Sequence, residues 1–330
     1  MKSVYVQDLD NNFPIDDVFS LDSGELLPFN RKPGNYLRLT ISDKTGTITA
    51  TLWDNAEDAY NQIADSKFVK IAGKTRTYKG KLTINVNSVV PVETEEVDLD
   101  DFLPTTSKDI DEMITFLESV IDGIENPNLK ELLDVFCNDD DFANDFIKAP
   151  AAKMYHQPYL GGLLEHTTNI LHLVPAVCSN YPEVDKDLLN TGVILHDIGK
   201  IKEYQYDVRI DMADEGRFLG HIILGIEMVN EKITEIDNFP EELRLKLLHM
   251  IASHHGHYEW QSPKIPKLLE ACLLHHLDLM DGEAYKFINV NKDSTNNWTW
   301  SKTLGRWVYT PVEQDEEEKN EDDFIPFPPY

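Results

Sequence analysis

The sequence predicts two domains of different class, a β-rich N-terminal domain followed by an all-helical domain. Short runs with period-two alternation occupy residues 36 to 92. From residue 110 onwards, apolar residues recur at helical spacing instead. At 330 residues, 41% of them hydrophobic, the chain is long enough for two cores. We therefore predict a multidomain fold in which a β domain precedes an all-α domain.

The β-rich part predicts a small barrel. Its β-like runs are residues 36–41, 46–53, 68–73 and 81–86. Turn sequences at residues 43–46 and 78–81 separate them, and a short helical pattern at residues 55–64 lies between the second and third runs. Strands, an interposed helix and a closing hairpin are typical of a five-stranded barrel of the oligonucleotide-binding (OB) type. We assign residues 1–95 to this domain.

An acidic segment that contains Pro104 predicts a linker at residues 96–108. Amphipathic helical patterns follow it at residues 110–121, 129–136, 162–177, 187–195, 221–235, 241–253 and 266–280. These patterns predict a helical domain over residues 109–312.

The charge of the chain is unevenly distributed. The formal net charge is −29, which by itself argues against binding to a polyanion such as nucleic acid. Residues 30–90 differ, because ten Lys and Arg against five Asp and Glu give this window a charge of +5. A nucleic-acid partner for the barrel is therefore not excluded.

The cysteines and the apolar runs indicate the cellular compartment of the protein. Cys137, Cys178 and Cys272 are far apart and lack C-x-x-C spacing, so we predict buried thiols rather than disulfides or structural zinc. The N-terminus lacks the apolar core of a secretory signal, and no apolar run reaches the roughly 18 residues that cross a bilayer. We expect a cytoplasmic protein.

A series of histidines and aspartates in the helical domain predicts a metal site. Its members are His166, the pair His196-Asp197, His221, the pair His254-His255, and Asp278. A single helical histidine is more often an ordinary residue than a ligand. An ordered series of imidazoles and carboxylates, however, suits one or two divalent ions, and paired ions suit phosphate-ester hydrolysis. The absence of thiolates argues against a closed structural zinc site.

This series resembles that of the HD superfamily of metal-dependent phosphohydrolases. Five segments are similar, more narrowly, to the YhaM-type 3′-5′ exoribonucleases: residues 151–153, 161–167, 196–200, 219–222 and 274–278. That family also places an OB barrel before the HD domain, so the resemblance covers about residues 1–310.

The resemblance implies ligands, a metal and an activity. It assigns one ion to His166, His196, Asp197 and Asp278, and a second ion, bridged by Asp197, to His221, His254 and His255. Manganese is the implied metal, although this donor set also suits Fe, Co or Ni. The implied activity is a 3′-5′ exonuclease on single-stranded RNA, with DNA as a second candidate substrate, and a homo-oligomer is left open.

Two alternatives stay open at this point. The site could hydrolyse a nucleotide or cyclic dinucleotide, although such a substrate needs no strand-capturing barrel. The chain could instead be a single-strand-binding protein whose HD site is inactive or regulatory.

Several residues beside the series are candidates for catalysis or substrate binding. Asp197 and Lys200 are the predicted catalytic residues, with Lys200 binding a phosphate oxygen, unless it is a solvated lysine at a helix end. We expect Glu165 to orient a ligand histidine, with a surface acid as the alternative, and His275 and His276 to have packing or surface roles. His156 and Tyr159 precede a glycine turn and are predicted to contact the terminal nucleotide, with packing as the alternative.

Basic residues alternate with aromatic rings in the barrel, a pattern that favours single-strand binding. The predicted nucleic-acid contacts are Tyr36, Arg38, Lys70, Arg76, Tyr78, Lys79 and Lys81. For Trp53 and Phe68, a place in the barrel core is at least as well supported as stacking.

Residues 313–330 form an acidic tail, in which eight acids and one lysine between residues 313 and 323 predict disorder. A solubilising end is the simplest interpretation. The tip at residues 322–327 resembles the acidic Ile-Pro-Phe end of bacterial single-strand-binding proteins, which recruits protein partners, but Pro328, Pro329 and Tyr330 follow it here. A third interpretation is that the acids shield the basic face of the barrel.

Overall fold

The computed structural model describes residues 2–29, 32–78, 80–153, 156–206, 209–290 and 297–311. Residues up to Asp281 form one compact unit, which holds a β-barrel and a set of helices, and residues from Gly282 form a second. The predicted acidic tail and Lys79 lie outside the described residues.

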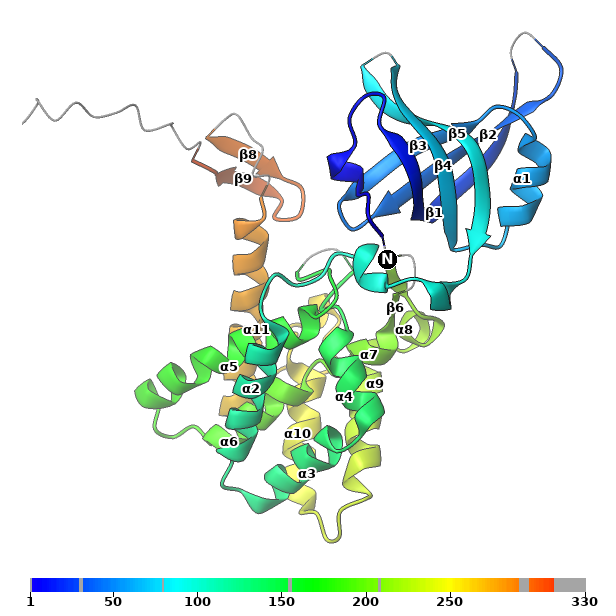
Figure 1. Ribbon diagram of the computed structural model, residues 1–330. Helices are drawn as coiled ribbons and strands as arrows, with labels where there is room; N and C mark the ends of the chain where they lie inside the picture. The colour runs from blue at the N-terminus through cyan, green and yellow to red at the C-terminus, as the bar shows by residue number, and fades with distance from the viewer. Residues whose placement is uncertain are drawn as a thin grey trace, which may run out of the picture. The chain divides into compact units, whose positions relative to one another are not determined.

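The N-terminal domain is a closed five-stranded barrel with strand order β1-β2-β3-β5-β4 (Figure 1). Its elements are a short 3₁₀ helix at Val6–Asp8, β1 (Pro14–Pro28), β2 (Asn35–Asp43), β3 (Gly46–Leu52), α1 (Ala56–Ile63), β4 (Phe68–Tyr78) and β5 (Lys81–Val92). The position of α1 between β3 and β4, and the parallel pairing of β3 with β5, close the barrel as an OB-type barrel requires. The predicted fold class of this domain is confirmed.

The alternation of the strands supplies the barrel core. Along β2, Leu37, Leu39 and Ile41 are buried, whereas Arg38 between them is exposed. Strand β1, which the sequence pattern missed, repeats this alternation, with Ile15 and Phe19 buried. Its acidic residues hide the apolar period, because Asp17 at a buried position interrupts it.

The predicted linker contacts both the barrel and the helical part of the chain. Two 3₁₀ turns, Thr94–Glu96 and Leu99–Asp101, lead to the buried side chains of Phe102 and Leu103. The Phe102 ring lies 4.8 Å from that of Phe68, and the backbone N–H of Thr106 donates to Leu160 O at 2.9 Å. These residues therefore pack, although acidity and Pro104 predict an open connection.

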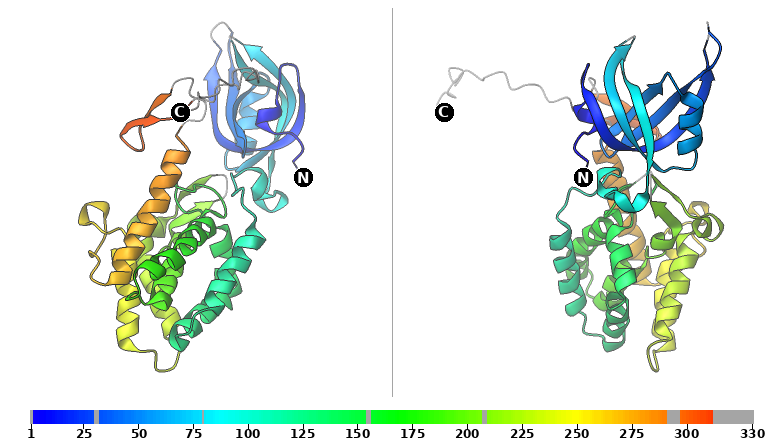
Figure 2. Two further views of the ribbon diagram at one scale, coloured as in Figure 1. Left: turned by 90° about the vertical axis from the view of Figure 1, so that its left-hand side faces the viewer. Right: turned by 45° about the vertical axis from the view of Figure 1, so that its right-hand side comes forward.

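The helical domain consists mainly of α2 to α11. Its helices are α2 (Ile110–Asp122), α3 (Pro127–Cys137), α4 (Asp140–Lys148), α5 (Gly162–Asn180), α6 (Lys186–Leu195), α7 (Lys200–Glu203), α8 (Asp214–Phe218), α9 (Gly220–Ile233), α10 (Glu241–Ser253) and α11 (Leu269–Ile288). Helices α9 and α10 pack side by side (Figure 2). One apolar core joins these helices except the short α8, and it includes Leu129, Leu163, Val193 and Leu274.

The helical periodicity located seven of these helices, six of them to within a few residues, whereas α11 extends eight residues beyond its predicted end at residue 280. It missed α4, whose only buried residue is Phe146, and the short helices α7 and α8. It also missed two hairpins, β6 (Tyr204–Tyr206) with β7 (Ile210–Met212), and β8 (Trp298–Ser301) with β9 (Arg306–Tyr309). A 3₁₀ turn at Tyr258–Trp260 follows α10. Strands of three or four residues are too short to display a period.

The cysteine prediction was wrong about burial. Cys137 and Cys272 are exposed, and Cys178 is half-buried and packs against the helical core. All three are free thiols, as predicted. No described helix has an apolar stretch long enough to cross a lipid bilayer.

Candidate metal centre

The predicted metal-site residues all lie at or near the ends of helices, except Asp278. His196 and Asp197 follow the last turn of α6, and His254 and His255 follow α10. His166 lies in the first turns of α5, His221 is the second residue of α9, and Asp278 lies within α11. Five helices thus direct seven side chains towards one region.

Gly199 allows α9 to approach Asp197. A Cβ atom at this position would clash with the carbonyl oxygen of His221 and with the backbone N–H of Gly225. Only glycine permits such close contact between the turn after α6 and the start of α9. The His-Asp-x-Gly-Lys spacing therefore positions His221 as well as the His-Asp pair.

Asp197 lies between two groups of histidines. Its Oδ2 is 3.2 Å from His196 Nε2 and 3.6 Å from His166 Nε2. Its Oδ1 is 3.6 Å from both His221 Nε2 and His254 Nε2. The two oxygens of one buried carboxylate thus face different groups of imidazoles.

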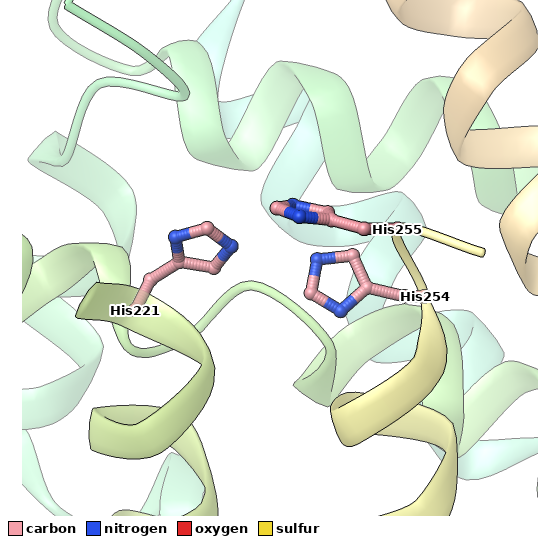
Figure 3. A group of neighbouring side chains, drawn as sticks. All are labelled: His221, His254 and His255. Atoms are coloured by element: carbon pink, nitrogen blue, oxygen red, sulfur yellow. The ribbon is translucent and has the colours of Figure 1, made fainter. Parts of the chain in front are cut away.

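Each group has the composition of a metal site. Ligand atoms of His166, His196 and Asp197 lie within 4.8 Å of one another, and so do those of His221, His254 and His255. Figure 3 shows the second group, in which His221 from α9 faces the two histidines at the end of α10. Asp278 adds to the first group, since its Oδ1 is 3.2 Å from His166 Nε2.

The hydrogen bonds of the rings define their tautomers. The Nδ1 atoms of His196, His254 and His255 lie 2.8, 2.8 and 2.9 Å from the backbone carbonyl oxygens of Val193, Ile251 and Trp260. A carbonyl oxygen only accepts, so each Nδ1 carries the proton. Two further rings use carboxylates, with His166 Nδ1 2.7 Å from Asp281 and His221 Nδ1 3.1 Å from Glu203. Nε2 of each ring is left as the metal-binding atom.

The atoms that face the centre lack hydrogen-bond partners. Nε2 of His166, His196, His221 and His254, together with Asp197 Oδ1, are buried without one. Buried polar atoms are normally satisfied, so a cluster of lone pairs directed at one another requires a cation or protons. One or two divalent ions fit this donor set, which contains nitrogen and carboxylate oxygen only.

The ionisation of the centre agrees with that requirement. Burial opposes a charge on Asp197, but Lys200 and His196 hold the pKa of its carboxyl well below the ordinary value. Burial would likewise lower the pKa of His166, but Asp278 and Asp281 raise it to about 9. Burial lowers the pKa of His254, so that ring stays neutral. Carboxylates and neutral imidazoles are the forms that bind metal, so an ion bound at His166 would displace the proton that this ring carries without one.

Comparison with known proteins locates both domains. The HD domain family model matches residues 163–283, and the OB-fold nucleic acid binding domain model matches residues 18–92. The 3′-5′ exoribonuclease YhaM of Bacillus subtilis (strain 168) is 36% identical over 255 residues, 77% of this chain and 80% of that protein. The enzyme of the same name from Bacillus velezensis is 35% identical over 271 residues, 82% of this chain and 85% of that protein.

The chain belongs to the YhaM family of 3′-5′ exoribonucleases. Among solved structures, the second OB-fold domain of replication protein A from Methanococcus maripaludis is 18% identical, with a TM-score of 0.23 over 27% of this chain and 94% of that one.

Two carboxylates contact candidate ligand histidines of this YhaM family member, and the sequence interpretation named neither. Asp281 accepts from Gln157 Nε2 at 2.8 Å and from Asn169 Nδ2 at 2.9 Å, and it lies against His166. Glu203 contacts both the ring and the backbone N–H of His221. Spacing offers a signal for Asp281, because it follows Asp278 by three residues and shares its helix face.

The expectation for Glu165 was wrong. Its carboxylate accepts from Thr106 Oγ1 at 2.6 Å and from the Tyr159 hydroxyl at 2.9 Å, and it lies 3.7 Å from Lys108 Nζ. Glu165 is next to His166 in sequence, but adjacent helical residues point about 100° apart. It therefore links the predicted linker to α5 rather than orienting a ligand.

Lys200 is buried, so its interpretation as a solvated lysine was wrong. Its Nζ donates to Asp197 Oδ2 at 2.6 Å, which places an ammonium group directly at the centre. The sequence placed Lys200 at the C-terminal end of a helix. In the structure α6 already ends at Leu195, and Lys200 is the first residue of α7.

His156 and Tyr159 lie on the side of the centre formed by α5. The His156 ring centroid is 5.2 Å from that of His166, and burial, then Lys200, lowers its pKa to about 3. His156 Nδ1 is buried without a hydrogen-bond partner. Tyr159 is half-buried and donates its hydroxyl to Glu165. His275 is buried with Nδ1 2.8 Å from His254 O, whereas His276 is exposed.

Four of the predicted basic contacts of the barrel lie in the part of the chain that the structure describes, and all four are exposed. Two of these four are paired with acids. Arg38 donates to Glu25 at 2.6 Å, and Lys70 Nζ is 3.1 Å from Asp16. Both acids belong to β1, which lies outside the +5 window of residues 30–90. The local positive charge is therefore smaller than that window indicates. Arg76 and Lys81 are also exposed, as is Tyr78 at 61%.

The aromatic residues of the barrel separate into buried and exposed rings. Phe68 is fully buried and therefore offers no stacking surface, but it packs against Phe102 and is not part of the apolar cluster inside the barrel. Trp53 is 44% exposed, so a core position was wrong for it. Its ring centroid lies 5.1 Å from Tyr36 and 6.2 Å from Phe29, a residue that the sequence interpretation omitted. We call Phe29, Tyr36 and Trp53 the barrel aromatic cluster. Lys32 Nζ lies 4.0 Å from the Phe29 ring centroid.

Proposed function

We propose that this chain is a metal-dependent exonuclease that removes nucleotides from the 3′ end of single-stranded RNA. The observation that supports this best is the Asp197 carboxylate, whose two oxygens face two separate histidine groups. A bridged pair of ions is suited to in-line displacement at a phosphodiester. The direction and the RNA preference follow from the named activity of the relatives.

The chain's own groups prepare the centre for this reaction. Bound divalent ions would supply a nucleophilic hydroxide at neutral pH and neutralise charge on the phosphate. Asp197, His166, His196 and Asp278 would hold one ion, and His221, His254 and His255 the other, with Asp197 shared. Asp281 and Glu203 maintain the ring orientations of His166 and His221.

Lys200 and His156 have separate proposed roles beside the ligands. The Lys200 ammonium is hydrogen-bonded to Asp197. In this position it can also attract a nonbridging oxygen of the phosphate. His156 stays neutral next to His166, so its ring can contact the terminal nucleotide without adding charge to the centre. Tyr159 is a weaker candidate, because its hydroxyl already binds Glu165.

The barrel is the proposed strand-binding module. Its aromatic cluster offers stacking surface at Trp53, and Tyr78 is exposed as well. Exposed Arg38, Lys70, Arg76 and Lys81 can follow the phosphates, and Lys79 is proposed from sequence alone. This combination gives sequence-tolerant binding, so DNA is a second candidate substrate.

Manganese is the proposed ion. The centre contains five imidazoles and two carboxylates, a borderline donor set that Mn, Fe, Co and Ni all accept. Metal analysis of the purified protein, followed by reconstitution of the chelated protein with each ion separately, tests this choice. Activity restored best by an ion other than Mn²⁺ would contradict it.

One assay tests the activity as a whole. The protein with Mn²⁺ should shorten a 5′-labelled single-stranded RNA stepwise from its 3′ end, and a 3′-phosphorylated or duplex-blocked end should slow this reaction. Internal cleavage, or hydrolysis of mononucleotides alone, would reject the proposal.

A further inference from the structure

The hairpin β8–β9, which is labelled in Figure 1, carries aromatic residues that the metal centre and the barrel do not use. Trp298 pairs with Tyr309, and Trp300 pairs with Trp307, so four rings share one face of the hairpin. Three of the five tryptophans of the chain lie here. We call this set the hairpin aromatic face.

The aromatic face is not the core of the hairpin. On the other face, Val308 and Leu304 are buried together with Val290. Thr299, the cross-strand partner of Val308, bonds through its hydroxyl to Thr310 at 3.1 Å. The hairpin therefore already has a buried side, and the four rings are additional.

The rings are open to contact. Trp298, Trp300, Trp307 and Tyr309 are 58%, 50%, 62% and 56% exposed. The cross-strand centroid separations are 5.3 Å for Trp298–Tyr309 and 5.8 Å for Trp300–Trp307, both near edge-on. Edge-on pairing stabilises a hairpin, but it leaves ring faces accessible. A contiguous exposed aromatic surface generally marks an interaction site.

Charge indicates the class of partner. Residues 297–311 contain Lys302 and Arg306 and no acidic residue, whereas the whole chain has 59 acids and a net charge of −29. Both basic side chains are exposed near the turn of the hairpin. Aromatic rings flanked by cations, without carboxylates, suit a polyanion whose bases stack, rather than a basic or purely apolar partner.

The spacing of the rings suits a single strand. Residues two apart on a β-strand, such as Trp298 and Trp300, are separated by roughly 6.8 Å. This is about twice the 3.4 Å rise between stacked bases. Neighbouring rings on the face are therefore about two base-stacking steps apart.

We propose that the hairpin aromatic face is a second binding surface for single-stranded nucleic acid, with the bases stacked on its rings and the phosphates near Lys302 and Arg306. This proposal deepens the proposed function and rests on it for the identity of the strand. It assigns to the hairpin a contribution to strand affinity that is separate from the chemistry of the metal centre.

The test uses the full-length chain with the outer ring pair replaced, Trp298→Val and Tyr309→Val together. Valine keeps the preference for strand, and the inner Trp300–Trp307 pair remains as an internal reporter of the hairpin through its exciton-coupled circular dichroism. Affinity is measured by fluorescence anisotropy in EDTA, with a labelled oligouridylate about 30 nucleotides long, roughly twice the largest site of one OB barrel.

We expect the double variant to bind this strand about tenfold or more weakly than the wild type, with the inner-pair signal retained. An abasic strand of equal length should bind both proteins equally, because stacking needs bases. Lys302→Gln should reduce the slope of log affinity against log salt by about 0.7.

Three outcomes overturn the proposal. The first is unchanged affinity with the inner pair intact, and the second is an equal loss on the abasic strand. The third is a change in oligomeric state by sedimentation without a change in strand affinity, which would assign the face to a second copy of the chain. If the hairpin signal is lost, Trp300→Val alone, with near-ultraviolet dichroism from the Trp298–Tyr309 pair, is measured under the same criteria. Because EDTA prevents cleavage, failure of the proposed exonuclease activity leaves these binding results interpretable.

Discussion

The metal centre and the barrel aromatic cluster differ in how firmly their side chains are held. Around the centre, five imidazoles each have Nδ1 bonded to a defined acceptor, and most are buried. In the barrel, Trp53 is 44% exposed, and Asn85 accepts a hydrogen bond from its Nε1 at 3.1 Å. Chemistry on a phosphodiester needs fixed ligands, whereas binding any strand needs adaptable stacking surfaces. The proposed reaction site therefore differs from the proposed strand-binding site in that most of its side chains are buried and hydrogen-bonded.

The sharpest test of this comparison is Asp197→Asn, which removes the shared carboxylate charge between the two histidine groups. We expect the rate of RNA shortening to fall roughly a thousandfold or more, because both proposed ions lose a ligand. Strand affinity in EDTA should stay within about twofold, since the barrel is unchanged. A large loss of binding in this variant would show that the two regions are not separable.

A smaller effect is expected when the support of a ligand is changed. Gln157 and Asn169 both donate hydrogen bonds to the Asp281 carboxylate. In Asp281→Asn the new side-chain NH2 group would face one of these donors, so the hydrogen bond that orients the His166 ring would weaken. Metal affinity, measured by titrating activity against free Mn²⁺, should fall about 10- to 100-fold.

Glu165→Gln is the matched control for that variant. Glu165 is also a carboxylate beside His166 in sequence, but it binds Thr106 and Tyr159. Its metal affinity should change by less than about twofold, since it orients no ligand ring. Equal effects of the two variants would indicate a general electrostatic role rather than orientation of His166.

A moderate effect is expected in the barrel. Trp53→Ala should weaken strand binding by about 1–3 kcal/mol, roughly 5- to 150-fold in Kd, and raise KM with little change in kcat. Steady-state kinetics on a long single strand measure both constants. A fall in kcat with unchanged KM would place Trp53 in the reaction instead of in capture.

The smallest effect is expected for Arg38→Gln. Glu25 already neutralises Arg38 at 2.6 Å, so the guanidinium displaces few counterions from a bound strand. The slope of log affinity against log salt should therefore change by less than the roughly 0.7 expected of one free phosphate contact. A full change of that size would mean that the strand displaces Glu25.

Much of the fold is readable from periodicity, and the exceptions have identifiable causes. Long helices such as α5 and α10 show their apolar period over many residues. Strand β1 was missed because the polar residue Asp17 occupies a buried position in it. The backbone N–H groups of Ser3 and Val4 donate hydrogen bonds to the Asp17 carboxylate there. These hydrogen bonds involve residues distant in sequence, so no local pattern reveals them.

The candidate site divides in the same way. The identity of the donors and the His-Asp and His-His pairs are visible as sequence motifs. Asp281, Glu203 and Phe29 were missed because their importance depends on what they contact. Lys200 was misjudged because a lysine near a predicted helix end is normally solvated, whereas here Asp197 compensates its burial.

The sequence by itself determined the two domain classes and the set of imidazole and carboxylate donors, because residue type and periodicity are local properties. Only the tertiary structure decided that Asp197 directs one oxygen to each histidine group, that Nε2 is the free atom of the rings, and that Trp53 is a surface residue. These features depend on distances between helices and strands that are far apart in the chain, which packing determines and local sequence does not.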